Sequence, residues 1–245
     1  MSVAAMDTLA PRVAGLSRLS SVDWPDRLVA TVFFQGCPWD CRYCHNPDLI
    51  DPHTAGSISW ADVHAFLQRR RQLLDGVVFS GGEPTMQAAL RPAIDEVREL
   101  GFTVGLHTAG AFPAALDAVL EHVDWIGLDI KANESDYATV TARRGSGTHA
   151  WRSLEKVLAA ADRADGDRVL GYEVRTTVHP DLTDAATLRG LGERLLAEGV
   201  ASWALQRVRA VGSRMTTRSP GDGSPDLVGQ IAAEFDGRFA HLTTR

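Results

Sequence analysis

The three cysteines of this chain lie within eight residues of one another. Cys37, Cys41 and Cys44 stand in the run Gly-Cys-Pro-Trp-Asp-Cys-Arg-Tyr-Cys-His-Asn-Pro, with CxxxCxxC spacing. Thiolates on one short loop can converge on a metal centre, but three of them leave a four-ligand site incomplete. The loop therefore predicts a metal centre with one coordination position open to another ligand.

Two other uses of these cysteines must be weighed. A disulfide is disfavoured because the cysteine count is odd and the first residues contain no apolar core typical of a secretory signal, so we expect a reducing cytoplasmic compartment. A structural zinc site of the Cys3His type would use His45. Adjacent residues such as Cys44 and His45 rarely aim at one tetrahedral centre, and zinc ligands usually form two separated pairs. The spacing favours a cluster of four irons and four sulfides, with zinc as the alternative.

The elements that would carry this loop follow from hydrophobic periodicity. Short apolar or β-branched runs predict six buried parallel strands at Leu28–Phe34, Gly76–Phe79, Phe102–Leu106, Trp125–Ile130, Leu170–Val178 and Trp203–Val208. Helical patterns lie between and after them at Ser59–Leu74, Gln87–Leu100, Pro113–Glu121, Ala150–Ala164, Asp184–Glu198 and Asp226–Phe235, with Ser59 and Asp184 as N-caps. Such alternation predicts βα units around a parallel sheet.

Six βα units are fewer than a closed (β/α)8 barrel needs. The expected fold class is therefore α/β, a partial (β/α)6 TIM-like barrel that is open laterally. We expect one domain over residues 1–245, with an N-terminal extension at 1–27. An irregular loop at 211–225, rich in Gly, Ser, Thr and Pro, is expected to form a cover or to face a partner.

Composition excludes two classes of partner. The chain has 245 residues, 44% of them hydrophobic, and no apolar run that approaches the ~18 residues of a membrane span. Its net charge is -6, whereas proteins that bind a nucleic-acid backbone usually present a basic surface. We therefore expect a protein that binds neither nucleic acid nor membrane.

Polar and glycine residues follow the predicted strands at the end where barrels of this type place their chemistry. Gly81, Gly82 and Glu83 lie after the second strand, where glycines let the backbone approach a ligand or simply form a turn. Asp129 and Lys131 end the fourth strand on the same face, either toward the barrel mouth or as a surface ion pair.

Two further charged or titratable residues lie on or directly after predicted strands. Arg175 stands in an otherwise apolar strand and needs a buried partner, for which a carboxylate is the natural choice. A ligand carboxylate is one candidate, and Glu173, on the same strand face, is the other. His107 follows the third strand, in His107-Thr108-Ala109-Gly110.

The cysteine loop, with Tyr43 as the aromatic residue before the last cysteine, resembles that of the radical S-adenosylmethionine enzymes. The segments Thr31–Cys37, Cys44–Pro47 and Ser21–Pro25 are similar to those of the branch that activates glycyl-radical enzymes, above all the anaerobic ribonucleoside-triphosphate reductase activating proteins. That family also has a partial (β/α)6 barrel. The resemblance implies that S-adenosylmethionine chelates the open iron of one 4Fe-4S cluster.

The resemblance also assigns roles to the residues at the strand ends. It implies that Tyr43 and the Gly81-Gly82-Glu83 segment contact the cofactor, the latter at the methionine amino group. In the same way Asp129 and Lys131 would contact the methionine carboxylate and ribose region, and Arg175 would face the cofactor.

The chain departs from the branch pattern at two positions. His107 replaces an Asp that holds a monovalent cation in some members, and is expected to hydrogen-bond the cofactor or to cap its loop. Asp26 stands where the branch has a glycine after Val-Asp-x-Pro.

The resemblance implies a reductive mechanism. An electron passes from the cluster to the cofactor, whose carbon–sulfur bond breaks to give methionine and a 5′-deoxyadenosyl radical, and this radical abstracts hydrogen from the substrate. We expect no side chain to act as a general acid or base. With no cysteine beyond Cys44 the chain can hold no second cluster of the usual cysteine-bound kind, so the electron must come from a separate donor, a flavodoxin or ferredoxin.

The function implied is an anaerobic activase that installs a glycyl radical on a partner, the anaerobic ribonucleotide reductase. One alternative is a radical S-adenosylmethionine enzyme that acts on a small molecule or another peptide. A second alternative is a non-enzymatic module that binds zinc or an iron–sulfur cluster.

Overall fold

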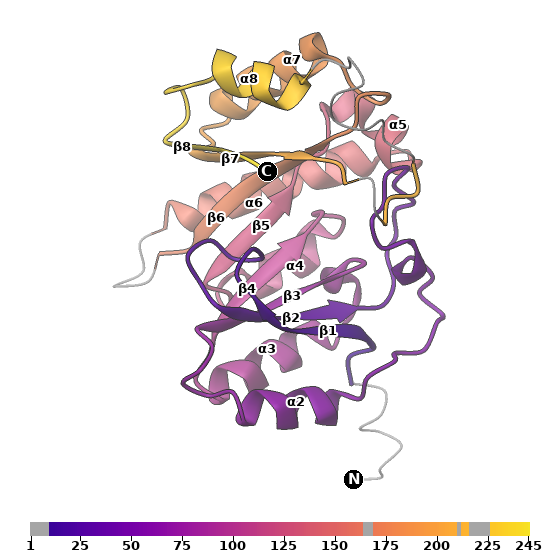
Figure 1. Cartoon of the computed structure of the whole chain (residues 1–245), viewed down its shortest axis with the longest axis vertical. Coiled ribbons are helices and arrows are strands. Elements are labelled where there is room, and N and C mark those ends of the chain that lie inside the picture. Colours follow the sequence, from indigo (N-terminus) through magenta and orange to yellow (C-terminus); the bar gives the residue numbers. More distant parts are fainter. Residues whose placement is uncertain (1–9, 164–168, 210–211, 216–225) are drawn as a thin grey trace.

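In the computed structural model, which describes residues 10–163, 169–209, 212–215 and 226–245, one curved sheet organises the chain (Figure 1). Its eight strands follow each other in sequence order: β1 (Val13–Ser20), β2 (Val29–Phe34), β3 (Gly76–Gly81), β4 (Thr103–Thr108), β5 (Trp125–Asp129), β6 (Gly171–Val178), β7 (Ser202–Arg207) and β8 (His241–Thr244). All neighbouring strands from β2 to β8 are parallel, and β1 pairs with β2 antiparallel. Because β1 and β8 are the two ends of the order, the sheet does not close.

The helices connect successive parallel strands. They are α2 (Trp60–Gln68), α3 (Leu90–Glu99), α4 (Pro113–Leu120), α5 (Tyr137–Thr141), α6 (Ser146–Ala161), α7 (Ala185–Ala197) and α8 (Leu227–Glu234), with 3-10 turns at Pro47–Leu49, Pro84–Met86 and Glu134–Asp136. Helices α2 and α3 lie at one end of the curved sheet, and α7 and α8 at the other (Figure 1). None of the described helices is both long and apolar enough to cross a membrane.

The open barrel predicted from periodicity is confirmed, and its six strands correspond to β2 through β7. The predicted N-caps are also found, since the Ser59 side chain accepts from the amide of Asp62 and that of Asp184 from the amide of Thr187. The predicted helix 59–74 ends early, at Gln68, and Gln72 beyond it has a left-handed φ of 66°.

Two strands were not predicted from the sequence. Strand β1 lies within the predicted N-terminal extension, and β8 is only four residues long. Most residues of both are half-buried or exposed, so neither shows the buried apolar run by which the other strands were recognised. Of the predicted loop at 211–225, only residues 212–215 are described.

Opposite faces of the sheet bury different sets of side chains. Val77 and Phe79 of β3 belong to the large core shared with the helices. Between them, Val78 faces the other way and packs with Trp24 and Trp125, whose rings stack at 5.7 Å. Trp24 belongs to the segment before β2. Because Trp24 packs on the face of the sheet opposite to the helices, this segment fills the inside of the barrel.

Candidate active site

The predicted site residues come together in one cleft at the carboxyl ends of the strands. The cleft has a volume of about 190 Å³. It is lined by every predicted site residue except Glu83, namely Cys37, Cys41, Cys44, Tyr43, Gly81, Gly82, His107, Asp129, Lys131 and Arg175. Since these residues come from five different strand ends and loops, the open barrel is what assembles them.

The cysteine loop follows β2 and is held on one side by α5. The amide of Asp40 donates to the carbonyl of Thr141 at 3.1 Å, and that of Arg42 donates to the carbonyl of Val140 at 3.0 Å. At its start, the amide of Cys37 donates to the carbonyl of Ile50 at 3.0 Å. Hydrogen bonds from the amides of Cys37, Asp40 and Arg42 therefore fix the backbone of the cysteine loop.

On its other side the cysteine loop is held by a segment more than 160 residues away in sequence, residues 209–215, of which 209 and 212–215 are described. The amide of Arg214 donates to the carbonyl of Cys44 at 3.1 Å, and the guanidinium of Arg214 pairs with Asp40. The amide of Arg209 donates to Nε2 of His45 at 3.0 Å. No motif in the sequence linked this segment to the cysteine loop.

The three thiols suit a metal cluster better than a single zinc ion. His45, the fourth ligand of the zinc alternative, uses Nε2 to accept the bond from Arg209. Within the described part of the chain, no three His, Cys, Asp or Glu side chains are placed to hold one metal ion. The ligands of an iron–sulfur cluster do not have to converge on one metal ion, because each cysteine binds a different iron.

Burial of the thiols also calls for a positive partner. Burial raises the pKa of Cys37 to about 12 and raises the pKa of Cys41 as well. Thiolates at these positions therefore depend on a cationic centre to stabilise them. A 4Fe-4S cluster with three cysteine ligands and one open iron fits this donor set.

Asp129, Lys131 and Arg175 form a buried network on the wall of the cleft. Asp129 lies between the two cations: Lys131 Nζ is 2.9 Å from Oδ2, and the guanidinium of Arg175 is 2.9 Å from Oδ1. The side chain of Lys131 is 8% exposed, so this is not the surface ion pair considered above. The other expected salt bridge, from Glu173 to Arg175, is wrong, because Arg175 binds Asp129 across neighbouring strands while Glu173 pairs with Arg245 at 2.8 Å.

The charges of this network are set by its members. Burial by itself would raise the pKa of Asp129, but Lys131 and Arg175 bring it down to about 2. Burial opposes the charge of Lys131, yet Asp129 holds the pKa of Lys131 well above its ordinary value. Two cations and one anion leave one surplus positive charge at the wall, which suits the carboxylate of a ligand.

His107 is held as a neutral ring. Its Nε2 lies 2.6 Å from the carbonyl oxygen of Asp23, which can only accept, so Nε2 carries the proton. Burial lowers the pKa of His107 to about 3. The ring faces the cleft and also packs edge-on against Trp125 at 5.6 Å. His107 thus offers hydrogen bonding but no charge.

Gly81 and Gly82 are required by the packing of β3 on β2. A Cβ at Gly81 would lie 2.2 Å from the backbone nitrogen of Phe34, and one at Gly82 would lie 2.2 Å from the carbonyl oxygen of Gly36. Gly81 also has a φ of 123°, which other residues rarely adopt. The close packing of the backbone is thus enough to require glycine at both positions, as expected for a simple turn. The two residues also line the cleft.

Glu83 does not line the cleft, although it was predicted to contact the cofactor. Its carboxylate is fully buried and accepts four hydrogen bonds, two from Thr85, one from the hydroxyl of Thr108 and one from the amide of Ala109. Burial raises the pKa of Glu83, and these bonds act in the opposite direction. Glu83 therefore ties the glycine turn to the end of β4, and so positions residues that do face the cleft.

Tyr43 is the most conspicuous unsatisfied group of the site. Its ring is buried, Lys131 Nζ lies 5.9 Å from the ring centre, and its hydroxyl has no hydrogen-bond partner among the described residues. Buried hydroxyls without partners are uncommon in proteins. The side chain fits a site in which a ligand or water supplies the missing partner.

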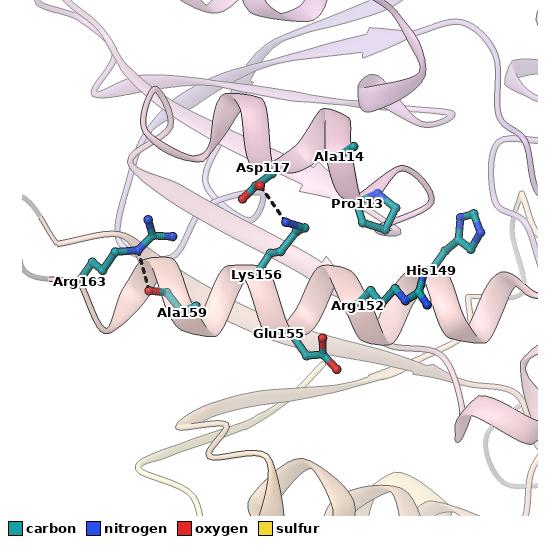
Figure 2. Close-up of a pocket in the computed structure, with 9 residues that line it drawn as sticks. All are labelled: Pro113, Ala114, Asp117, His149, Arg152, Glu155, Lys156, Ala159 and Arg163. Atoms are coloured by element: carbon teal, nitrogen blue, oxygen red, sulfur yellow. Dashed lines mark hydrogen bonds and ion pairs between the residues drawn. The ribbon is translucent and has the colours of Figure 1, made fainter.

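A wider groove lies outside the barrel, between α4 and α6 (Figure 2). Its volume is about 730 Å³, and it is crossed by the ion pair between Lys156 and Asp117 at 2.7 Å. It contains no cysteine and none of the predicted site residues. The smaller cleft at the strand ends is therefore the candidate active site.

Comparison with known proteins identifies the family of the chain. Residues 31–189, more than half of the chain, match the model of the Radical SAM superfamily. The chain is 28% identical over 187 residues to a candidate glycyl-radical enzyme activating enzyme of Methanocaldococcus jannaschii, with 74% of each chain covered. It is 31% identical over 182 residues to the pyruvate formate-lyase-activating enzyme of Clostridium pasteurianum, with 71% of each covered.

Solved structures share the fold at low sequence identity. SuiB of Streptococcus suis, crystallised with S-adenosylmethionine, has a TM-score of 0.63 at 11% identity; the match covers 86% of this chain and about half, 48%, of SuiB. QueE of Escherichia coli has a TM-score of 0.54 at 15% identity, and 96% and 93% of the two chains are covered. The chain therefore belongs to the radical SAM superfamily of enzymes, whose cofactors, a 4Fe-4S cluster and S-adenosylmethionine, are those predicted from its sequence.

Proposed function

We propose that the chain is an activase that installs a glycyl radical on a partner enzyme. The observation that carries this proposal is its similarity, over more than two thirds of its length, to one protein named as a glycyl-radical enzyme activating enzyme and to another named as a pyruvate formate-lyase-activating enzyme. When bound, the cluster and S-adenosylmethionine supply a radical that removes a hydrogen atom from a substrate carbon. What the chain itself must do is bind, orient and exclude water.

Four sets of residues would divide this work. Cys37, Cys41 and Cys44 would hold the cluster, and the backbone at Gly81-Gly82 would line the methionine end of the cofactor. Lys131 and Arg175 would bind its carboxylate, because the wall they share with Asp129 carries one surplus positive charge. The orphan hydroxyl of Tyr43 and the neutral ring of His107 would contribute hydrogen bonds. None of these groups has to transfer a proton.

The partners are proposals on the same basis. The resemblance of the segments around the cysteine loop favours the anaerobic ribonucleotide reductase as the enzyme activated. A separate electron carrier, a flavodoxin or ferredoxin, is required because only three cysteines are present. The compartment we propose is the cytoplasm, where such a carrier and reduced thiols would be available.

Electron paramagnetic resonance on two candidate partners tests this function. The chain is reconstituted anaerobically and mixed with S-adenosylmethionine, a chemical reductant and either an anaerobic ribonucleotide reductase or a pyruvate formate-lyase. We expect a glycyl-radical doublet on the reductase. A signal only on the lyase would keep the activase function and change the partner, whereas 5′-deoxyadenosine formation without any protein radical would favour an enzyme acting on a small molecule or another peptide.

A further inference from the structure

We propose that three exposed arginines around the cysteine loop form a docking surface for a small acidic electron-carrier protein. We call Arg42, Arg143 and Arg144 the arginine patch. This inference rests on the proposed function, because it concerns how the cluster of that same site is reduced.

Arg42 is an exposed residue of the cysteine loop itself. Only two residues separate Cys41 from Cys44, and they face opposite ways: Tyr43 is buried and lines the cleft, whereas Arg42 is exposed. An electron carrier that covers Arg42 therefore lies directly outside the cysteine loop.

Arg143 and Arg144 are brought to the same wall by backbone hydrogen bonds. The amides of Asp40 and Arg42 donate to the carbonyls of Thr141 and Val140, at the end of α5. The chain then turns at Ala142, with a left-handed φ of 53°, and presents Arg143 and Arg144 as exposed residues. Two short segments joined by backbone hydrogen bonds thus place three exposed arginines in and next to the cysteine loop.

The charge of this wall is positive on a protein that is acidic as a whole. Within the described part of the chain, no carboxylate lies within ion-pair distance of Arg42, Arg143 or Arg144. The nearest carboxylate in sequence, Asp40, is paired with Arg214. The chain has a net charge of -6, so the patch gives it a definite electrostatic orientation toward an acidic partner.

The position of the patch favours the electron carrier over the polypeptide substrate. A substrate must reach the cleft, which lies on the Tyr43 side of the cysteine loop. An electron has only to cross the loop itself. Because the chain has no further cysteine to bind a second cluster, an electron from outside must reach this one directly.

The test is the rate at which flavodoxin reduces the cluster of the reconstituted enzyme, followed by stopped-flow absorbance. The triple variant Arg42→Glu, Arg143→Glu, Arg144→Glu is compared with a control of equal charge change, Arg69→Glu, Arg70→Glu, Arg71→Glu, whose arginines are exposed at the end of α2. Electrostatic steering changes association rates by about 10- to 1,000-fold. We expect the patch variant to react at least tenfold more slowly with reduced flavodoxin at low salt, and the control to react like the wild type.

Salt and a second reductant separate docking from damage. Raising the salt to about 1 M, where the Debye length is about 3 Å, should slow the reaction of the wild type with flavodoxin. The rates of the wild type and the patch variant should then become similar. Reduced methyl viologen, a small cation, should reduce the cluster of the variant at least as fast as that of the wild type. The milder variant Arg42→Gln, Arg143→Gln, Arg144→Gln should react with reduced flavodoxin at a rate between those of the wild type and the Glu variant.

Other results overturn the proposal. The proposal fails if the Glu and Gln variants react with flavodoxin as fast as the wild type, or if the control is slowed equally. It also fails if the rate of the wild type does not depend on salt. Loss of binding to the glycyl-radical enzyme, with flavodoxin reduction intact, would assign the patch to that partner instead. If the wild type makes no glycyl radical with viologen but shows the patch effect with flavodoxin, the docking surface stands and the proposed function fails.

Discussion

Asp129 is predicted to stabilise the fold through its charge, and Asp129→Asn measures how much. The pKa of Asp129 falls from an ordinary 3.8 to about 2 because Lys131 and Arg175 flank it. A tenfold change in proton affinity corresponds to about 1.4 kcal/mol, so the charged carboxylate contributes roughly 2.5 kcal/mol at neutral pH. The Asn variant should lose about this amount.

The sign of the pH dependence follows from the lowered pKa. The contribution of Asp129 is fully present above the pKa of the unfolded chain, 3.8, and is lost as the pH falls through the folded value, about 2. The difference between wild type and variant should therefore be constant from pH 5 to 7 and fall to about half by pH 3.

Urea unfolding of the reduced, cluster-free chain at several pH values provides the measurement. Asp117→Asn serves as the control, because Asp117 is about half exposed and its pair with Lys156 lies on the outer groove. Exposed pairs contribute at most about 1 kcal/mol. A variant as stable as the wild type at pH 7, or a difference that does not shrink toward pH 3, would refute the assignment of the charge to this network.

Three further changes test other parts of the site. Lys131→Met removes the surplus positive charge, so it should weaken the binding of S-adenosylmethionine to the cluster-loaded chain at least tenfold, about 1.4 kcal/mol. Equilibrium dialysis measures this affinity, and the control Lys156→Met should leave it unchanged. Equal affinity in Lys131→Met and the wild type would exclude Lys131 as a carboxylate ligand. Asp40→Arg should speed bleaching of the cluster in air, and adding Arg214→Asp should restore the slow rate if their ion pair holds the cysteine loop; no rescue would leave that role without support. Asp26 has a left-handed φ of 60°, so Asp26→Gly should raise the free energy of unfolding by up to about 1 kcal/mol, and a loss of stability would contradict backbone strain there.

The sequence was sufficient for the strands whose side chains are buried on both faces. Val77, Val78 and Phe79, for example, form an unbroken apolar run because two different cores take alternate residues. The edge strands β1 and β8 escaped prediction because their residues are mostly half-buried or exposed and form no buried apolar run. Periodicity detects burial, so it detects strands only where the sheet is covered.

The cysteines and the strand-end residues were likewise predictable, because spacing and position after a strand are properties of the sequence itself. Their partners were not. Glu173, two residues away on the same strand, was one of the two candidate partners of Arg175, but Arg175 meets Asp129 on the neighbouring strand. The carbonyl that orients His107 belongs to Asp23, 84 residues earlier. Contacts of this kind depend on strand register and loop packing, which no local pattern encodes.

The charges of the cleft and the register of the sheet depend on each other. Asp129 is opposite Arg175 in the pairing of β5 with β6. A slip of one residue would turn Asp129 away from the cleft and leave the guanidinium of Arg175 buried without a carboxylate. Breaking a buried ion pair in this way costs about 3–5 kcal/mol, comparable with much of the stability of a domain. The residues proposed to hold the cofactor carboxylate therefore also select the strand pairing that brings them together, which explains how so polar a cleft can be built in advance of its ligand.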